Sequence, residues 1–73
     1  MKEKLFEILR NTLDVEVVDE STSQNNCPQW DSMNHLNLVL NIEMEFNISL
    51  TPEEIGSVLS AKDFIDLINI KIQ

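Results

Sequence analysis

The scarcity of glycine constrains the fold of this chain more than any other feature of its sequence. Gly56 is the only glycine, and no Asn-Gly pair occurs. Tight β-hairpins usually need glycine or Asn-Gly at their turns. Strict alternation of apolar and polar residues is confined to a few short stretches, whereas apolar residues recur at helical spacing. The sequence therefore predicts an all-α fold.

The length and the charge of the chain exclude several classes of protein. At 73 residues, we expect positions 1–73 to form a single domain with a small core. Catalytic folds such as a barrel or a doubly wound sheet need far more chain. The formal charge of −8 disfavours binding to nucleic acid or to an anionic membrane surface, and it suits partners with basic surfaces.

The sequence predicts neither export nor membrane insertion. Residues 1–12 lack the apolar region of a signal peptide, and no run approaches the roughly 18 apolar residues of a membrane span. The lone cysteine, Cys27, cannot form an internal disulfide, and no basic residue lies within ten positions to activate its thiol. No cluster of histidine and cysteine suits zinc. We therefore expect a soluble, cytoplasmic protein without a metal site.

Helical periodicity begins at the N-terminus. Apolar residues at Leu5, Ile8, Leu9 and Leu13 mark one face of a first helix over Lys2–Leu13. Three valines follow within residues 15–18, and we interpret them as a loop that turns the valines inward, with an edge strand as the alternative. Residues 20–29 are polar and without period, which predicts a long surface loop.

Capping patterns mark where three further helices begin. Asp31 is a good N-cap for a second helix over residues 32–45. Thr51, followed by proline and two glutamates, caps a short third helix with a capping box. Ser60 caps the last helix in the same way. The expected architecture is a four-helix bundle with a short third helix and a long loop between the first two helices.

The second helix has two apolar stripes, although a surface helix needs only one. The first stripe consists of Leu38, Val39, Ile42 and Phe46, and the second of Met33, Leu36, Leu40 and Met44. In one interpretation both stripes are buried, because a central helix can be covered on most sides. In the other, Met33, Leu36 and Leu40 form a partner-binding face, for which the flexible methionine side chain is well suited.

Ser32 is the candidate functional residue, because it follows the N-cap Asp31 at the start of this helix. Taken alone, a serine in this place is most often only a helix-start residue. The free amides and partial positive charge of a helix N-terminus nevertheless suit a phosphate or phosphodiester. The Asp31 carboxylate lies beside the hydroxyl, where it could orient a metal ion or a proton during a transfer onto the serine.

Five segments of the chain together resemble the acyl carrier protein family. The attachment region of that family is similar to residues 31–33 (Asp-Ser-Met), 38–39 (Leu-Val) and 42–46 (Ile-Glu-Met-Glu-Phe). Residues 51–55 (Thr-Pro-Glu-Glu-Ile) and 61–64 (Ala-Lys-Asp-Phe) resemble its third and fourth helices. The resemblance therefore covers nearly the whole chain.

The resemblance implies that Ser32 bears a 4′-phosphopantetheine arm, whose terminal thiol carries an acyl group as a thioester. It implies a monomeric carrier, not an enzyme, which shuttles this group between partner enzymes. These partners would be a phosphopantetheinyl transferase and the enzymes that load and transfer acyl groups. They would recognise the apolar stripe that contains Met33, Leu36 and Leu40.

Two departures from the family pattern bear on the pathway. Met33 stands where the family usually has leucine, and Trp30 stands where common fatty-acid carriers have a small residue. The Trp-Asp-Ser form resembles specialised carriers of polyketide, peptide or surface-glycan pathways, outside bulk fatty acid biosynthesis. An aminoacyl or peptidyl carrier remains an alternative. So does a cofactor-free helical adaptor that docks through Met33, Leu36 and Leu40.

Two aromatic residues flank Ser32. Trp30 either pins the long loop onto the bundle or is a half-exposed ring that contacts the arm or a partner. His35 lies three residues after Ser32 on the same predicted helix, where a catalytic serine–histidine pair rarely reaches the required geometry. We expect His35 to border the arm or the partner-binding face.

The acidic residues are distributed unevenly. Residues 11–61 contain nine acids and no base, yet residues 32–42 carry no charge when the histidine is neutral. The acids that flank this uncharged stretch are Asp31, Glu43, Glu45, Glu53 and Glu54. We expect these acids to steer partners toward an apolar contact surface.

Overall fold

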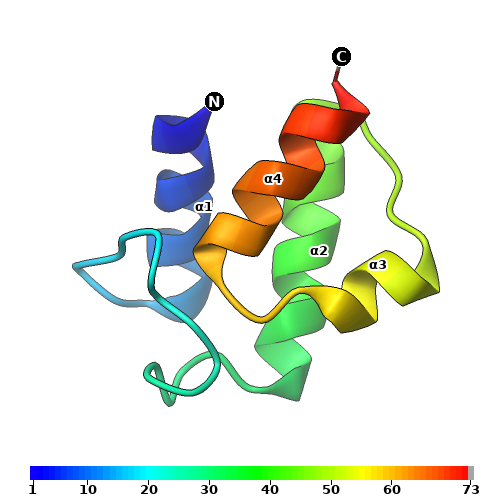
Figure 1. Ribbon diagram of the computed structural model, residues 1–73. Helices are drawn as coiled ribbons and strands as arrows, with labels where there is room; N and C mark the ends of the chain where they lie inside the picture. The colour runs from blue at the N-terminus through cyan, green and yellow to red at the C-terminus, as the bar shows by residue number, and fades with distance from the viewer. Residues whose placement is uncertain (73) are drawn as a thin grey trace.

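The computed structural model describes residues 1–72, and its four helices follow the predicted order. They are α1 (Lys2–Leu13), α2 (Ser32–Phe46), α3 (Pro52–Ser57) and α4 (Ala61–Lys71). In Figure 1, α1 runs in one direction while α2 and α4 run in the opposite direction, and the short α3 lies beside α2. The predicted all-α four-helix bundle is confirmed. No helix within the described residues is long and apolar enough to cross a membrane.

The starts of α2, α3 and α4 were predictable because each of these three helices has a side-chain cap. Asp31 accepts a hydrogen bond from the Asn34 amide at the start of α2, and Ser60 accepts one from Asp63 at the start of α4. Thr51 forms the predicted capping box with Glu54 at the start of α3. These bonds satisfy amides that a helix leaves without intrahelical partners.

One hydrophobic core joins all four helices and the long loop. Its largest fully buried side chains include Trp30 from the loop and Phe64 from α4. The other members are apolar residues at helical spacing, among them Leu5, Leu9 and Leu13 of α1 and Leu38, Val39 and Ile42 of α2. The first apolar stripe of α2 therefore faces the core.

The long loop, residues 14–31, is fastened to the connection between α3 and α4. Backbone bonds run from Gln24 N to the Leu59 oxygen at 3.2 Å and from Ala61 N to the Thr22 oxygen at 2.8 Å. An isolated antiparallel bridge pairs Ser23 with Ser60. The loop is thus tied down by main-chain bonds (Figure 1, lower left), because its polar backbone finds acceptors and donors across the bundle.

Several local expectations were wrong. Val17 is 81% exposed, so only Val15 and Val18 pack inward against the core. The helical spacing of apolar residues would also place Leu59 on one face with Ile55 and Val58, and Ile72 on one face with Ile65 and Ile68, but Leu59 and Ile72 are 57% and 50% exposed. The reason is that α3 ends at Ser57 and α4 at Lys71, so Leu59 and Ile72 lie beyond the ends of these helices and no longer follow their helical faces.

Candidate functional site

Ser32 is exposed at the first position of α2, at the end of the long loop. Its hydroxyl makes no hydrogen bond within residues 1–72, and neither do the backbone amides of Ser32 and Met33. These amides lie at the N-terminus of α2, which is the positive end of the helix dipole and stabilises a negatively charged group. An accessible hydroxyl and two free N–H donors therefore meet at one place.

The segment around Ser32 is braced from both sides. The Asp31 carboxylate accepts from the Asn34 amide at 2.8 Å, and the Asn34 side-chain amide donates to the Gln29 carbonyl oxygen at 2.8 Å. Within the described residues, the second carboxylate oxygen of Asp31 has no hydrogen-bond partner and stays available. The brace holds the serine backbone while leaving its side chain free.

Trp30 is buried, with an exposed fraction of 2%, so the interpretation that it pins the loop onto the bundle is correct. Its ring stacks on Phe64 of α4 at a centroid distance of 6.0 Å. Its indole N–H donates to Nδ1 of His35 over 3.0 Å. The half-exposed ring that was the alternative is excluded.

His35 lies half-buried between three parts of the molecule. It faces Trp30 and Phe64, and its Nε2 lies 2.8 Å from the Ile55 carbonyl oxygen of α3. Both ring nitrogens are directed into contacts within the protein, and the expectation that His35 borders the arm or the partner-binding face stays a prediction. The geometry also places the ring away from any partnership with the Ser32 hydroxyl.

The second apolar stripe of α2 is exposed. Met33, Leu36, Leu40 and Met44 have exposed fractions of 74%, 56%, 57% and 81%. The interpretation that both stripes are buried was therefore wrong. The stripe begins directly after Ser32 and forms a ridge of uncharged apolar side chains along α2, which we call the apolar ridge. A contiguous apolar surface of this kind is typical of a contact site.

Acidic residues stand around the apolar ridge, and two of them also hold the fold together. Glu43 accepts from the Leu50 amide at 2.8 Å, and Glu54 pairs with Lys71 of α4 at 2.8 Å. The hydrogen bond from Lys71 lowers the pKa of Glu54, and the Thr51 amide adds to the effect. Asp31, Glu45 and Glu53 are exposed. Asp31, Glu43 and Glu45 therefore give the two ends of α2 a negative charge, whereas the charge of Glu54 is paired with Lys71.

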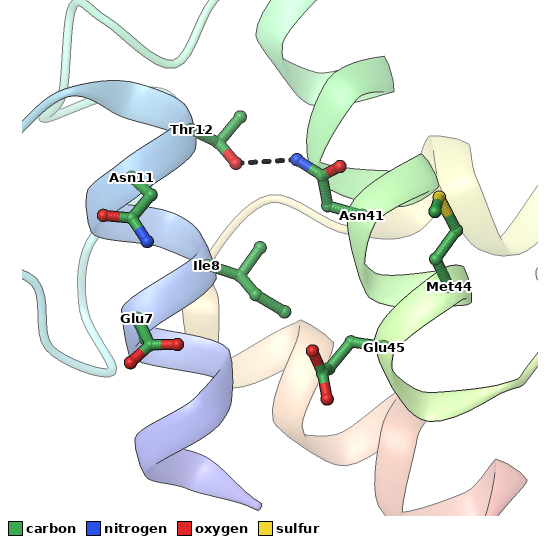
Figure 2. A pocket seen from close by; sticks show the side chains of 7 residues that line it. All are labelled: Glu7, Ile8, Asn11, Thr12, Asn41, Met44 and Glu45. Atoms are coloured by element: carbon green, nitrogen blue, oxygen red, sulfur yellow. Dashed lines mark hydrogen bonds between the residues drawn. The ribbon is translucent and has the colours of Figure 1, made fainter.

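An open groove of about 430 Å³ lies between α1 and α2 (Figure 2). It is lined by Glu7, Ile8, Asn11, Thr12, Asn41, Met44 and Glu45. Asn41, whose side-chain amide donates to Thr12 across the groove at 2.9 Å, follows Ser32 by nine residues, roughly 13 Å along the helix. The groove is separate from the serine site.

Sequence reasoning located Ser32, Asp31 and the apolar ridge but missed the contacts of His35. Nothing in the sequence near His35 indicates that its partner is a carbonyl twenty residues later. The adjacent tryptophan was a weak signal, since a buried indole N–H usually finds an acceptor.

Solved structures resemble the chain over almost its whole length. An acyl carrier protein from Thermotoga maritima is 30% identical, with a TM-score of 0.80, and the match covers 96% of this chain and 84% of that one. A holo acyl carrier protein from Geobacter metallireducens is 29% identical, with a TM-score of 0.87, covering 97% of this chain and 84% of that one. A third structure, from Mycobacterium tuberculosis, is 14% identical with a TM-score of 0.87 over 94% and 95% of the two chains, and it bears on the fold alone.

Neither models of protein families nor curated proteins gave a match to this chain.

Proposed function

Because the chain belongs to the acyl carrier protein family, we propose that it carries an acyl group as a thioester on a 4′-phosphopantetheine arm attached to Ser32. The family has a carrier role and is not enzymatic. The observation that carries the proposal is the exposed Ser32 at the N-terminus of α2. We also propose that residues 1–73 act as one carrier domain.

The residues around Ser32 suit such an arm. A phosphodiester on the Ser32 oxygen would lie next to the free amides of Ser32 and Met33, which can donate to its oxygens. When attached, the arm supplies a terminal thiol that holds the acyl group. The second oxygen of the Asp31 carboxylate is available to ligate a metal ion or to accept a proton while the serine is modified.

The apolar ridge is the proposed contact surface for partner enzymes. These partners are a phosphopantetheinyl transferase and the enzymes that load and transfer acyl groups. Met33, Leu36 and Leu40 would bury apolar area against them, while the surrounding acids would attract basic surfaces. Methionine at the first position of the ridge would let one surface adapt to several partners.

The cargo and pathway are proposed on the sequence near Ser32. Trp30 and Met33 distinguish this chain from common fatty-acid carriers, which supports a specialised biosynthetic pathway such as polyketide assembly. An aminoacyl or peptidyl group would be carried by the same thiol, so it remains the alternative cargo. A location in the cytoplasm remains a prediction.

The proposal is tested by incubating the purified protein with coenzyme A and a transferase of broad specificity, followed by intact-mass measurement. We expect a gain of one phosphopantetheine, absent in Ser32→Ala. Ser57→Ala is a matched control, since Ser57 is also an exposed serine of a helix. No mass gain with several transferases, the cognate one included, would overturn the proposal. The mass of the protein from its native host would identify the cargo.

A cofactor-free adaptor is the second candidate, and the exposure of the apolar ridge favours it. This function needs the ridge but not the serine hydroxyl. Its signature would be partner binding that survives Ser32→Ala and is lost in Leu40→Glu, with only unmodified protein present in the native host.

A further inference from the structure

We propose that His35 is a positioning residue that couples the Ser32 segment to α3 and thereby sets how well the modifying transferase recognises the protein. This inference rests on the proposed modification of Ser32. It starts from the observation that the half-buried His35 ring is hydrogen-bonded through one nitrogen to Trp30 and through the other to the Ile55 carbonyl of α3.

The first bond joins His35 to the segment that bears Ser32. The indole nitrogen of Trp30 can only donate, so Nδ1 of His35 is the acceptor of the 3.0 Å bond. This bond spans the start of α2 from residue 30 to residue 35. The bond from Asn34 to Gln29 spans nearly the same stretch. Together these two hydrogen bonds bridge residues on either side of Ser32.

The second bond joins His35 to α3. With Nδ1 acting as an acceptor, the ring proton resides on Nε2, which donates to the Ile55 carbonyl oxygen over 2.8 Å. In a longer helix this oxygen would accept from the amide four residues later. Here the Leu59 amide donates instead to the Asp63 carboxylate. His35 therefore caps a carbonyl that the short helix leaves without a backbone partner.

The two bonds specify one chemical form of the ring, the neutral tautomer with its proton on Nε2. The other neutral tautomer would place an N–H against the Trp30 N–H and a bare nitrogen against a carbonyl oxygen. In the doubly protonated ring, the N–H at Nδ1 would face the N–H of Trp30, so two donors would meet with no acceptor between them. A side chain at position 35 that satisfies both neighbours must present an acceptor to the Trp30 N–H and a donor to the Ile55 carbonyl oxygen.

Few other contacts hold α3, so its position should depend on the hydrogen bond from His35. None of the six residues of α3 is buried. Besides His35, the partly buried Ile55 side chain packs against the core, the ion pair between Glu54 and Lys71 joins α3 to α4, and Val58 anchors the chain just after the helix. Loss of the His35 bond would allow α3 and the Ser32 segment to move independently.

This independence should lower the fraction of molecules in the conformation that the transferase binds. The apparent affinity then falls by the reciprocal of that fraction, while the bound complex reacts as before. The loss of hydrogen bonds in His35→Leu should therefore raise the KM for the protein substrate about three- to tenfold, with kcat unchanged. His35→Gln should restore the KM, because its amide offers an oxygen to Trp30 and an N–H to Ile55.

The experiment measures kcat and KM for modification of the wild type, His35→Leu and His35→Gln by one transferase. Circular dichroism confirms that each variant is folded at the assay temperature. Thr12→Val is the matched control, since it removes a side-chain bond between α1 and α2 far from Ser32 and should leave the KM unchanged. Nitrogen-15 NMR of the wild-type imidazole should show the neutral ring with its proton on Nε2.

The possible outcomes separate the two proposals. A wild-type protein that no transferase modifies overturns the proposed function, and this inference with it. A modified wild type with an unchanged KM in His35→Leu overturns the inference alone. The same holds if His35→Gln behaves like His35→Leu, if kcat falls in place of a rise in KM, or if NMR finds another form of the ring.

Discussion

The indole ring of Trp30 lies parallel to the phenyl ring of Phe64, with an angle of 8° between the two planes and 6.0 Å between their centroids. Trp30 precedes Ser32 by two residues, and Phe64 lies in α4. The stack therefore fixes the end of the long loop, and with it the start of α2, to the core of the bundle.

Replacement of Trp30 should be strongly destabilising. Trp30→Ala removes a ring that is 2% exposed, and we expect it to lower the free energy of unfolding by about 3–5 kcal/mol. Trp30→Phe keeps an aromatic ring against Phe64 but removes the donor to His35, so a loss of about 1–2 kcal/mol is expected. Urea unfolding followed by circular dichroism measures both. Equal losses in the two variants would show that the stack contributes little.

Substitutions of Asp31 should separate its capping role from its proposed role in transfer. Asparagine caps helices about as well as aspartate, so Asp31→Asn should leave the free energy of unfolding nearly unchanged, whereas Asp31→Ala should lower it by about 1 kcal/mol. If the carboxylate ligates a metal ion or takes a proton, both variants should be modified at least about tenfold more slowly. Modification of Asp31→Asn at the wild-type rate would leave Asp31 as a cap only.

Salt should affect the association of partners more than their dissociation. The apolar ridge carries no charge, whereas the acids around it act over a distance that salt shortens. Binding of the protein to a transferase, measured by stopped-flow or surface plasmon resonance, should show a slower association rate and a nearly constant dissociation rate as the salt concentration increases. Leu40→Ala should show the converse, a faster dissociation with the same dependence of association on salt. A dissociation rate that dominates the salt effect would contradict an uncharged contact surface.

Acid should weaken the link between α3 and α4. The pKa of Glu54 is held below its ordinary value of 4.5, first by the hydrogen bond from Lys71. A carboxylate whose pKa is lowered in the folded state stabilises that state above the unfolded pKa. Its contribution is therefore present above about pH 4.5 and is lost as the pH falls through the lower folded value.

The comparison of wild type with Glu54→Gln isolates this effect. The variant should be less stable at neutral pH, and the difference in unfolding free energy should shrink as the pH falls below 4.5. The pKa of Asp19 is also lowered, chiefly by the Ser21 hydroxyl, but this group is common to both proteins and cancels. A difference that stays constant from pH 7 to pH 3 would contradict the role of Glu54.

The sequence by itself determined the helices, their starting points and the candidate serine. These features depend on interactions between residues three or four positions apart, such as the caps at Asp31, Thr51 and Ser60, and such interactions can be identified in one sequence. For the same reason the sequence could not decide where α3 and α4 end, because no comparable local signal stops them before Leu59 and Ile72.

Only the tertiary structure decided which apolar side chains are buried and what His35 contacts. The two stripes of α2 are equally apolar, and one becomes the exposed ridge because α1 and α4 pack with the long loop over the other. The bond from His35 to Ile55 joins residues twenty positions apart. Its formation depends on where the short α3 comes to rest against α2, which follows from the packing of the whole bundle and not from any local pattern.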